Sequence, residues 1–428
     1  MIKAEEIHIG IVGLGYVGLP LATLFASRYP TVGYDCNSHR VAELAKANDL
    51  TLEVDAAKLQ SALQSGRLTL ADKPEALKDC NVYIVAVPTP VDCNNHPDLM
   101  PLIRASQTVG ALLNKGDVVI YESTVYPGVT EDECVPQLVT ASGLKYNTDF
   151  FVGYSPERVN PSDTEHTIET IIKVTSGSTL ETADFVDELY NSVLRNGTHK
   201  TPSIRVAEAS KIVENCQRDV NIAFINELAK IFAAMGIDTN DVLAAAATKW
   251  NFIKMKPGLV GGHCISVDPY YLIEKAQVYG VLPRVMYSAR RLNDSMGAYV
   301  AGQVVKQMNL KGVPVKDAKI LILGFAFKEN CPDTRNTKVA DIYNSLKEYT
   351  PNIAVCDDWV DAERVRKDYG IEIKKTENIN QDIRYDAAIL AVAHRQFADI
   401  DLRRLVPEPG VVYDVKGVLP RHQIDARL

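Results

Sequence analysis

Residues 9–18 of the chain read IGIVGLGYVG, a Gly-x-Gly-x-x-Gly motif that begins within an apolar run. A motif of this spacing between a strand and a helix is typical of a dinucleotide-binding turn. Gly13 permits the tight turn, Gly15 lets a pyrophosphate approach the backbone, and Gly18 lets the helix pack against the strand. Because the N-terminus of that helix favours anions, the stretch predicts a nucleotide cofactor bound at this turn.

A carboxylate lies where the second strand of the predicted fold ends. Asp35 follows the run 31–34, twenty-two residues after the first glycine of the motif. A carboxylate at this position hydrogen-bonds the ribose hydroxyls and repels a 2′-phosphate, so we expect NAD rather than NADP. Arg40 lies nearby and keeps NADP as the alternative. The predicted cofactor site also includes Arg40 itself and, inside the motif, Tyr16 and Val17.

Short apolar runs alternate with helix-length segments in both the first and the last part of the chain. Apolar strands that alternate with helices predict a parallel sheet covered on both faces. We therefore expect an α/β protein with two Rossmann-like parallel-sheet domains. The runs are 7–12, 31–34, 81–87, 118–121 and 150–153 in the first series, and 320–324, 353–356, 387–392 and 411–413 in the second.

A long helical segment separates the two series. Residues 203–235 show helical periodicity and contain neither Pro nor Gly. A helix of about thirty residues spans about 45 Å, more than one small domain requires. We interpret it as a central helix that joins the two Rossmann-like domains and packs against a second copy of the chain, which predicts a homodimer or larger homo-oligomer. A helix in the core of one domain is the alternative. The predicted domains are 1–202, 203–310 and 311–428.

The composition argues against several classes of protein. The chain has 428 residues with 46 basic and 54 acidic side chains, a net charge of −8, whereas nucleic-acid binding usually needs a basic surface. No stretch approaches the ~20 apolar residues that span a bilayer, so we expect no membrane partner. The 8 cysteines show neither a Cys-x-x-Cys pair nor zinc-site spacing. We expect a cytoplasmic protein with reduced thiols and no metal.

Residues 256–269, KPGLVGGHCISVDP, hold the main candidate for covalent chemistry. Glycines cluster where a backbone turns with positive φ or approaches a ligand. Cys264 follows them, and a thiol near a cationic group such as His263 ionises and becomes nucleophilic. A buried, unreactive thiol is the alternative, because free cysteine is among the most often buried residues. A nucleotide cofactor together with a presented thiol predicts oxidation through a covalent sulfur intermediate.

Two sets of polar residues are candidates for work beside this thiol. Lys211 and Asn215 are four apart on the long helix and share one face, which suits the stabilisation of an oxyanion. Ordinary surface positions are the alternative for both. Glu157 follows the predicted strand 150–153 and is a candidate general base. A surface ion pair with Arg158 is the alternative for Glu157.

Polar loops follow other predicted strands, where ligands of such sheets bind. We expect four residues of the first domain to line the cofactor or the reaction site, with helix capping as the alternative. In the second domain, Lys328 and Arg335 follow the first strand and supply cations suited to phosphates. The four residues are Pro88, Thr89, Ser123 and Thr124.

Together these motifs resemble those of the UDP-glucose/GDP-mannose dehydrogenase superfamily, whose members use NAD to oxidise the C6 alcohol of a nucleotide sugar to a carboxylate. The stretches 248–252 (TKWNF) and 267–272 (VDPYYL) are similar to the bacterial UDP-N-acetyl-D-glucosamine 6-dehydrogenase branch. Val267 stands where the UDP-glucose branch normally carries a lysine. The motifs are GLGYVG (13–18), VPTP (87–90), STVYPG (123–128), SPER (155–158), AEASKIVEN (207–215), GGHCISVD (261–268), FAFK (325–328) and DTR (333–335).

The resemblance implies a role for each of these residues. Cys264 is the nucleophile, Lys211 and Asn215 stabilise the oxyanion, and Glu157 assists thioester hydrolysis. Asp268 and Thr124 position the catalytic water or a proton, while Arg335 meets the NAD pyrophosphate. The implied substrate-binding residues are Glu157, Arg158, Lys211, Asn215, Asn251, Phe252, Gly258, Gly261 and Lys328.

The predicted reaction is a four-electron oxidation of UDP-N-acetylglucosamine (UDP-GlcNAc) to its uronate, for the synthesis of surface polysaccharides such as capsule and O-antigen. UDP-GalNAc, UDP-ManNAc and UDP-glucose are the alternative substrates. An epimerase or dehydratase that recycles NAD is a further alternative, for which Tyr343 and Lys347 show the Tyr-x-x-x-Lys spacing. A non-catalytic NAD-sensing module is the alternative from a different class.

Overall fold

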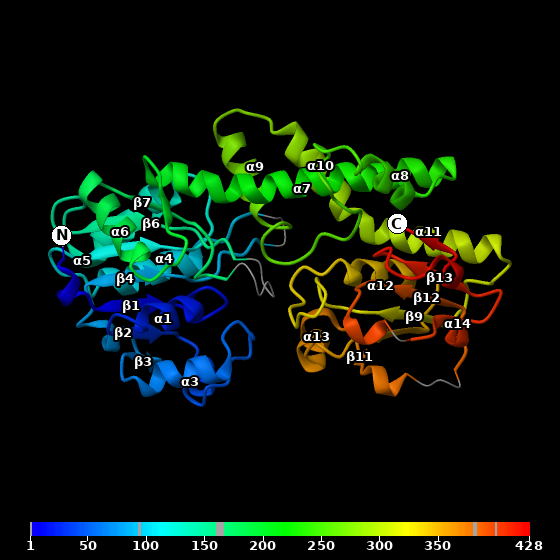
Figure 1. Cartoon of the computed structure of the whole chain (residues 1–428), viewed down its shortest axis with the longest axis horizontal. Helices are drawn as coiled ribbons and strands as arrows, with labels where there is room; N and C mark the ends of the chain where they lie inside the picture. Colours follow the sequence, from blue (N-terminus) through cyan, green and yellow to red (C-terminus); the bar gives the residue numbers. More distant parts are fainter. Residues whose placement is uncertain (1, 93–95, 160–166, 380–382, 399) are drawn as a thin grey trace. The chain divides into compact units, whose positions relative to one another are not determined.

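The computed structural model describes residues 2–92, 96–159, 167–379, 383–398 and 400–428. The chain divides into two units, one formed by residues 1–214 and 270–281 and the other by 215–269 and 282–428. Each unit contains one β-sheet, and the helix α7 (Ile204–Met235) carries the chain from the first unit into the second (Figure 1). The predicted α/β fold with two sheets and a long central helix is confirmed.

The first unit has an eight-stranded sheet of order β3-β2-β1-β4-β5-β6-β7-β8. The first six strands are parallel and follow the 3-2-1-4-5-6 order of dinucleotide-binding folds. Strand β7 departs from the expected pattern, because it pairs antiparallel with β6. The strands are β1 (Ile9–Val12), β2 (Thr31–Tyr34), β3 (Leu68–Ala71), β4 (Val82–Val85), β5 (Val118–Tyr121), β6 (Phe151–Tyr154), β7 (Lys173–Gly177) and β8 (Thr198–Lys200).

The second unit repeats the same strand order with a six-stranded parallel sheet, β11-β10-β9-β12-β13-β14. Its first strand in chain order, β9, therefore takes the central place that β1 has in the first sheet. The strands are β9 (Ile320–Leu323), β10 (Ile353–Cys356), β11 (Ile373–Lys374), β12 (Ala387–Leu390), β13 (Val411–Asp414) and β14 (Ala426–Arg427).

Helices connect the strands of both sheets (Figure 1). Those of residues 1–203 are α1 (Gly18–Ala26), α2 (Ser38–Ala45), α3 (Ala56–Gln64), α4 (Met100–Gly110), α5 (Val135–Ser142) and α6 (Leu180–Asn191). After α7 come α8 (Thr239–Ala246), α9 (Asp268–Val278), α10 (Arg284–Asp294), α11 (Met296–Leu310), α12 (Val339–Lys347), α13 (Ala362–Tyr369) and α14 (Leu402–Leu405). Short 3-10 or π turns are Ala4–Glu6, Pro74–Leu77, Thr130–Cys134, Thr376–Asn378, Arg395–Phe397 and Arg421–Gln423.

Alternate residues of the central strands pack into different hydrophobic clusters. In β5, Val118 and Ile120 belong to one cluster of the first unit, while Val119 and Tyr121 belong to another. Since successive side chains of a strand point to opposite faces, both faces of this sheet are covered. The second sheet is built in the same way, with Ile320 and Leu321 in different clusters. Burial on both faces explains why these strands are almost entirely apolar.

Candidate active site

The glycine turn after β1 has the geometry that its sequence predicts. Gly13 has a φ of +93°, and a Cβ there would lie 2.8 Å from the carbonyl oxygen of Ala86. A Cβ at Gly18 would lie 1.8 Å from the carbonyl oxygen of Gly13, so helix and turn approach too closely for any side chain. At Gly15 a Cβ would meet nothing within 4 Å. The close approach that Gly15 permits is therefore left for a ligand, and this turn fits the pyrophosphate of NAD.

The carboxylate of Asp35 is oriented by the same turn. Its Oδ2 accepts a hydrogen bond from the backbone N–H of Leu14 (2.8 Å), and its Oδ1 accepts one from Asn37 (2.9 Å). Arg40, the residue that kept NADP as an alternative, is almost fully buried. Its guanidinium donates to the carbonyl of Leu14 (2.9 Å) and pairs with Asp49 (2.8 Å). These contacts hold Arg40 against protein groups and support NAD as the cofactor.

The loops after β4 and β5 are tied to one another. The hydroxyl of Thr89 donates to the carbonyl of Thr124 (2.7 Å), and that of Ser123 donates to the carbonyl of Val87 (2.7 Å), the residue before Pro88. The structure thus brings together all four residues that were predicted from these two loops. Tyr16 and Val17, in the glycine turn, are partly exposed. Contact of these six residues with the cofactor stays a prediction.

Glu157 follows β6 and has one oxygen bound by the backbone. Its Oε1 accepts hydrogen bonds from the N–H groups of Arg158 (2.6 Å) and Val159 (2.5 Å), whereas its buried Oε2 makes no hydrogen bond within the described part of the chain. The guanidinium of Arg158 pairs with Glu214 of α7 instead (2.8 Å). Glu157 is therefore not engaged in the surface ion pair with Arg158 that was its alternative.

Lys211 and Asn215 are both nearly buried on α7, with 7% and 4% of their surface exposed. The side-chain amide of Asn215 donates to Oδ2 of Asp268 (2.5 Å). The backbone N–H of Asp268 in turn donates to the carbonyl of Cys264 (2.8 Å), since α9 begins directly after the cysteine loop. Three predicted residues, Asn215, Cys264 and Asp268, are thus linked through hydrogen bonds. Burial also argues against the alternative that Lys211 and Asn215 are ordinary surface residues.

Glu208, one turn before Lys211, anchors α7 to the first sheet. Its carboxylate is fully buried and accepts hydrogen bonds from the backbone N–H groups of Gly128 (2.6 Å) and Thr130 (2.9 Å). Burial raises the pKa of Glu208 to about 7, although these hydrogen bonds oppose the rise. The bonds fix the loop that follows Thr124 against the helix that carries Lys211.

Cys264 differs from most cysteines of the chain in its exposure. It is partly exposed, while five of the other described cysteines are buried and Cys36 is exposed. Burial raises the pKa of Cys80, Cys134 and Cys216 to about 12 and that of Cys356 to about 11, so these thiols stay protonated at neutral pH. The structure therefore contradicts the alternative that Cys264 is a buried core thiol.

A charged cluster lies beside Cys264. Nδ1 of His263 is 3.5 Å from Oδ2 of Asp333 and 2.9 Å from Nη2 of Arg335, and Arg335 also pairs with Asp333 (2.6 Å). Burial lowers the pKa of His263, but the charge of Cys264 and the hydrogen bond to Asp333 outweigh it and raise this pKa to about 9. His263 thus connects the sulfur to the charged pair of Asp333 and Arg335. Sequence reasoning quoted Asp333 only as part of a motif and gave it no role.

Two buried side chains hold the loop of Cys264 at both ends. Asn226 of α7 accepts from the N–H of Gly258 (2.8 Å) and donates to its carbonyl (3.0 Å). Arg290 of α10 donates to the carbonyl of Ile265 (3.2 Å) and pairs with Asp219 of α7 (2.5 Å). Sequence reasoning missed this network, although polar residues at apolar positions of a helix are a signal for it.

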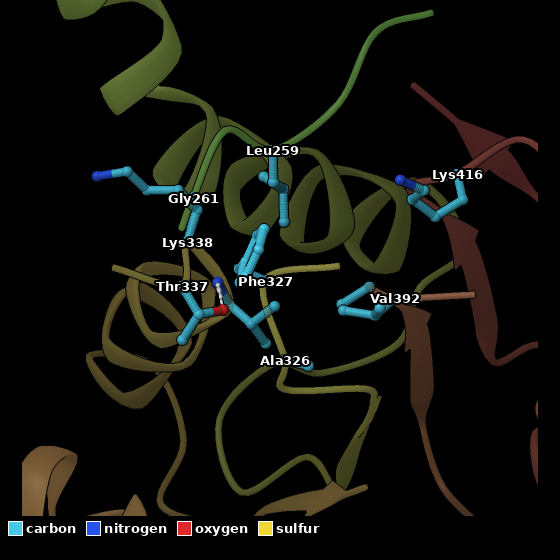
Figure 2. A pocket seen from close by; sticks show the side chains of 10 residues that line it. Leu259, Gly261, Ala326, Phe327, Thr337, Lys338, Val392 and Lys416 are labelled. Carbon is cyan, nitrogen blue, oxygen red and sulfur yellow. Dashed lines mark hydrogen bonds between the residues drawn. The ribbon is translucent and has the colours of Figure 1, made fainter. Parts of the chain in front are cut away.

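A pocket lies at the carboxyl ends of the strands in the second unit (Figure 2). Leu259 and Gly261 line it from the cysteine loop, Phe327 from the segment after β9, and Lys338 and Lys416 supply cations. Ligands of parallel sheets bind at this edge. Both lysines are paired with carboxylates, Lys338 with Asp294 (3.0 Å) and Asp341 (3.2 Å), and Lys416 with Glu329 (2.6 Å). Sequence reasoning missed both lysines. The other lining residues are Ala326, Thr337, Val339, Ala391 and Val392.

Several other residues that were predicted to bind the substrate do not line this pocket. Lys328 directly follows the pocket residue Phe327 and is partly exposed. Gly258 precedes the pocket residue Leu259, while Asn251 and Phe252 are not among the residues that line this pocket. In the described ranges no group of three or more His, Cys, Asp or Glu side chains is placed to hold a metal ion. No described helix is both long enough and apolar enough to cross a bilayer.

The chain matches three models of one family in order. They are the NAD binding domain (residues 7–194), the central domain (205–295) and the UDP binding domain (321–421) of the UDP-glucose/GDP-mannose dehydrogenase family. The chain belongs to this family. It is an NAD-dependent UDP-sugar dehydrogenase, and the predicted family, enzyme class and cofactor are confirmed.

Relatives of this dehydrogenase cover its full length. A UDP-N-acetyl-D-glucosamine 6-dehydrogenase of Pseudomonas aeruginosa is 53% identical over 99% of this chain and 100% of its own, and one of Salmonella typhi is 50% identical over 100% of both. Among solved structures, a UDP-D-ManNAc dehydrogenase of Pyrococcus horikoshii is 30% identical, with a TM-score of 0.89 over 98% of both chains.

Proposed function

We propose that this dehydrogenase oxidises the C6 alcohol of UDP-N-acetyl-D-glucosamine to the carboxylate, through a thiohemiacetal and a thioester on Cys264. The observation that carries the proposal is the partly exposed Cys264, on a loop fixed by Asn226 and Arg290 and beside the cationic cluster of His263. The substrate rests on the identities of 53% and 50% to two full-length relatives that bear the name UDP-N-acetyl-D-glucosamine 6-dehydrogenase.

The roles of the residues follow from this reaction. NAD, when bound at the glycine turn of the first unit, accepts the hydride of each oxidation. Cys264 adds to the C6 aldehyde, which turns it into a tetrahedral adduct that can give up a second hydride. Lys211 and Asn215 stabilise the oxyanion, and Asp268 orients Asn215 through their hydrogen bond. Glu157 takes a proton from the water that cleaves the thioester.

The positions of the remaining ligand groups are also part of the proposal. Asp35 binds the ribose of NAD, and Arg335 meets its pyrophosphate. In the second unit, Lys328 and the pocket between Leu259 and Lys416 hold the uridine diphosphate, with the loop 251–258 beside it. The roles of Thr124 and Arg158 are those that the resemblance implies.

UDP-N-acetyl-D-mannosamine is the second candidate substrate. A UDP-N-acetyl-D-mannosamine dehydrogenase of Pyrococcus horikoshii is 33% identical over 96% of this chain. The solved structure of a UDP-D-ManNAc dehydrogenase from the same organism has the same fold as this chain. UDP-GalNAc is a further candidate, and UDP-glucose is a weaker one, because Val267 stands where the UDP-glucose branch normally carries a lysine.

A substrate panel tests the proposal. The purified enzyme is supplied with NAD and, in turn, UDP-GlcNAc, UDP-GalNAc, UDP-ManNAc and UDP-glucose, and NADH is followed at 340 nm. We expect the highest kcat/KM with UDP-GlcNAc and two NADH per sugar converted. One NADH per sugar would contradict the thioester route. Conversion of the sugar without net accumulation of NADH would favour an epimerase or dehydratase. Binding of NAD without conversion of any sugar would favour a sensing module.

We also propose a homodimer formed through α7. Phe224, Ile231 and Met235 of this helix expose 55%, 46% and 62% of their surface, and seven and four residues separate them, so they follow one side of the helix. Phe224→Asp is expected to shift the sedimentation coefficient toward that of a monomer, and an unchanged coefficient would contradict this interface. The division into domains at 202 and 310, a cytoplasmic location and a role in surface polysaccharide synthesis complete the proposal.

A further inference from the structure

Four side chains of the first unit form a buried cluster around the ammonium group of Lys173. Lys173 begins β7, and its side chain has no exposed surface. Its Nζ donates to Oε2 of Glu122 (2.6 Å) and to the carbonyl of Pro156 (3.0 Å), and lies 3.7 Å from Oε2 of Glu157. The ring centroid of Tyr190 lies 5.5 Å away. A lysine is almost never buried to this extent unless it is paired, and here two carboxylates share one cation.

The antiparallel course of β7 explains how the lysine reaches Glu157. The register of β6 and β7 sets Tyr154 opposite Ser176. Because β6 runs towards Glu157 while β7 runs away from Lys173, both residues lie just beyond this pairing at the carboxyl end of β6. A parallel strand at this place would have put its amino-terminal residue at the opposite edge of the sheet. The one departure from parallel order thus places a cation beside the predicted base.

Glu122 and Tyr190 keep this cation in place. The hydroxyl of Tyr190, on α6, donates to Oε1 of Glu122, and the ammonium of Lys173 occupies the other oxygen. Burial raises the pKa of Glu122 to about 7, with the charge of Lys173 opposing the rise and that of Glu157 adding to it. Both oxygens of Glu122 are therefore occupied by donors, and the ammonium of Lys173 is held between Glu122 and Glu157.

Glu157 has one oxygen fixed and one oxygen ready to act. Two backbone N–H groups hold Oε1, while Oε2 has no hydrogen-bond partner among the described residues and faces Lys173. The other nearby cation, Arg158, has its guanidinium on Glu214. A carboxylate that must accept a proton needs an oxygen that is free of other hydrogen bonds and within reach of that proton.

We propose that Lys173 is a positioning residue for thioester hydrolysis, which keeps Oε2 of Glu157 oriented for the reacting water. This inference rests on the proposed role of Glu157 as the base. In that step, the oxygen of water bonds to the acyl carbon and its proton passes to Oε2 of Glu157. The carbon–sulfur bond breaks, and its electron pair returns to Sγ of Cys264 as the thiolate. Lys173 touches none of the reacting atoms and acts only through Glu157.

The test removes the cation without leaving an uncompensated buried carboxylate. Lys173→Gln/Glu122→Gln is compared with Glu122→Gln alone, so that the two proteins differ only at Lys173. We expect the double variant to release a rapid burst of about two NADH per active site. Steady turnover should then be at least tenfold slower, because the step assisted by the base is impaired. Intact-mass spectrometry during turnover should show the acylated enzyme.

Several outcomes would overturn the inference. Turnover and acylation equal to those of Glu122→Gln would show that Lys173 does not act on Glu157. Slow turnover without a burst and without acylated enzyme would show that Lys173 serves an earlier step or the fold. NAD affinity should be equal in all variants, and Lys200→Met, which removes an exposed lysine of the same unit, should behave as the unaltered enzyme.

Two further measurements keep the test decisive. If the glutamine pair does not fold, Lys173→Met/Glu122→Leu fills the same volume with apolar groups, which buried ion pairs often tolerate, and the same three readouts apply. If the unaltered enzyme makes no NADH with any UDP-sugar, the proposed function fails rather than this inference.

Discussion

The two sheets have the same strand order, yet the carboxylate at the end of their second strand has a different environment in each. Asp35, after β2, is partly exposed and accepts two backbone hydrogen bonds. Asp357, after β10, is fully buried and accepts four, from the N–H groups of Phe325, Ala326 and Trp359 and from the ring of His394. An ionised carboxylate has about four acceptor positions. Oδ2 of Asp357 accepts three of these bonds and Oδ1 one, and full burial keeps both oxygens from a ribose, whereas each oxygen of the partly exposed Asp35 accepts one.

The glycine turns next to Asp35 and Asp357 also differ in whether they leave room for a ligand. Gly13 and Gly324 begin them with φ of +93° and +89°. Two residues later, Gly15 leaves open space in the first turn, but the second turn has the fully buried Ala326. The second sheet thus keeps the tight turn and loses the place where a pyrophosphate approaches. The same backbone position is open for the proposed cofactor contact in the first unit and is filled by a buried side chain in the second.

The largest expected effect comes from removing the sulfur of Cys264, which should stop catalysis but leave the binding of NAD by the first unit unchanged. Cys264→Ala removes the nucleophile and is expected to lower kcat at least about 10⁴-fold, because such groups dominate covalent catalysis. The glycine turn of the first unit is untouched, so the Kd for NAD, measured by calorimetry, should change less than twofold. Cys36→Ala, at the exposed cysteine of the first unit, is the matched control and should retain turnover. Normal uronate production by Cys264→Ala would refute the assignment of the nucleophile.

The second prediction concerns the stability of the two turns. Asp357→Asn puts an amide among four hydrogen-bond donors and should destabilise the second unit by at least about 3 kcal/mol. Asp35→Asn is the matched variant in the first unit and should cost less than about 1 kcal/mol. Hydrogen exchange of residues 320–330 should accelerate in Asp357→Asn, with no matching change over 9–18 in Asp35→Asn. Equal effects would mean that both carboxylates serve the fold alike.

The third prediction concerns how the stability of the unaltered protein and of Asp357→Asn depends on pH. Burial would raise the pKa of Asp357, but hydrogen bonding and charge from His394, with the bonds from Phe325 and Ala326, outweigh it and hold this pKa below its usual range. The resulting stability is present above about pH 4, the pKa of an unfolded aspartate, and is lost as pH falls further. The stability gap between the unaltered protein and Asp357→Asn should therefore narrow below pH 4. A constant gap from pH 6 to 3 would contradict this linkage.

Local sequence signals predicted the parts of this molecule that depend on local chemistry. The motif at 9–18 gave β1, the turn and α1, and the uninterrupted periodicity of 203–235 gave α7. Strands β7 and β8 were not predicted, because Lys173–Gly177 and Thr198–Lys200 are short and rich in polar residues. Their role depends on distant pairs, since Lys173 meets Glu122 across 51 positions of the chain.

Contacts between residues far apart in the sequence also limited how much of the site could be predicted. Cys264 stood out through its glycines, but Asn226 binds Gly258 across 32 positions and Arg290 meets Asp219 across 71. No periodicity or motif connects residues so far apart. Likewise, nothing in the sequence after β10 indicates that Asp357 accepts a hydrogen bond from His394, which lies 37 positions later. Sequence reasoning therefore singled out Asp35, but it did not single out Asp357 and could not have told that this second carboxylate serves the fold.

The smallest expected effect concerns cofactor choice, and it tests the free acceptors of Asp35 directly. Asp35→Asn keeps the size of the side chain but removes the charge that favours ribose hydroxyls and repels a 2′-phosphate. We expect the KM for NAD to rise about tenfold, a loss of about 1.4 kcal/mol, and the preference for NAD over NADP to fall. Arg40 is held by Leu14 and Asp49, so we expect no strong gain of NADP affinity from its guanidinium. An unchanged ratio of kcat/KM for NAD and NADP would show that Asp35, like Asp357, serves only its own turn.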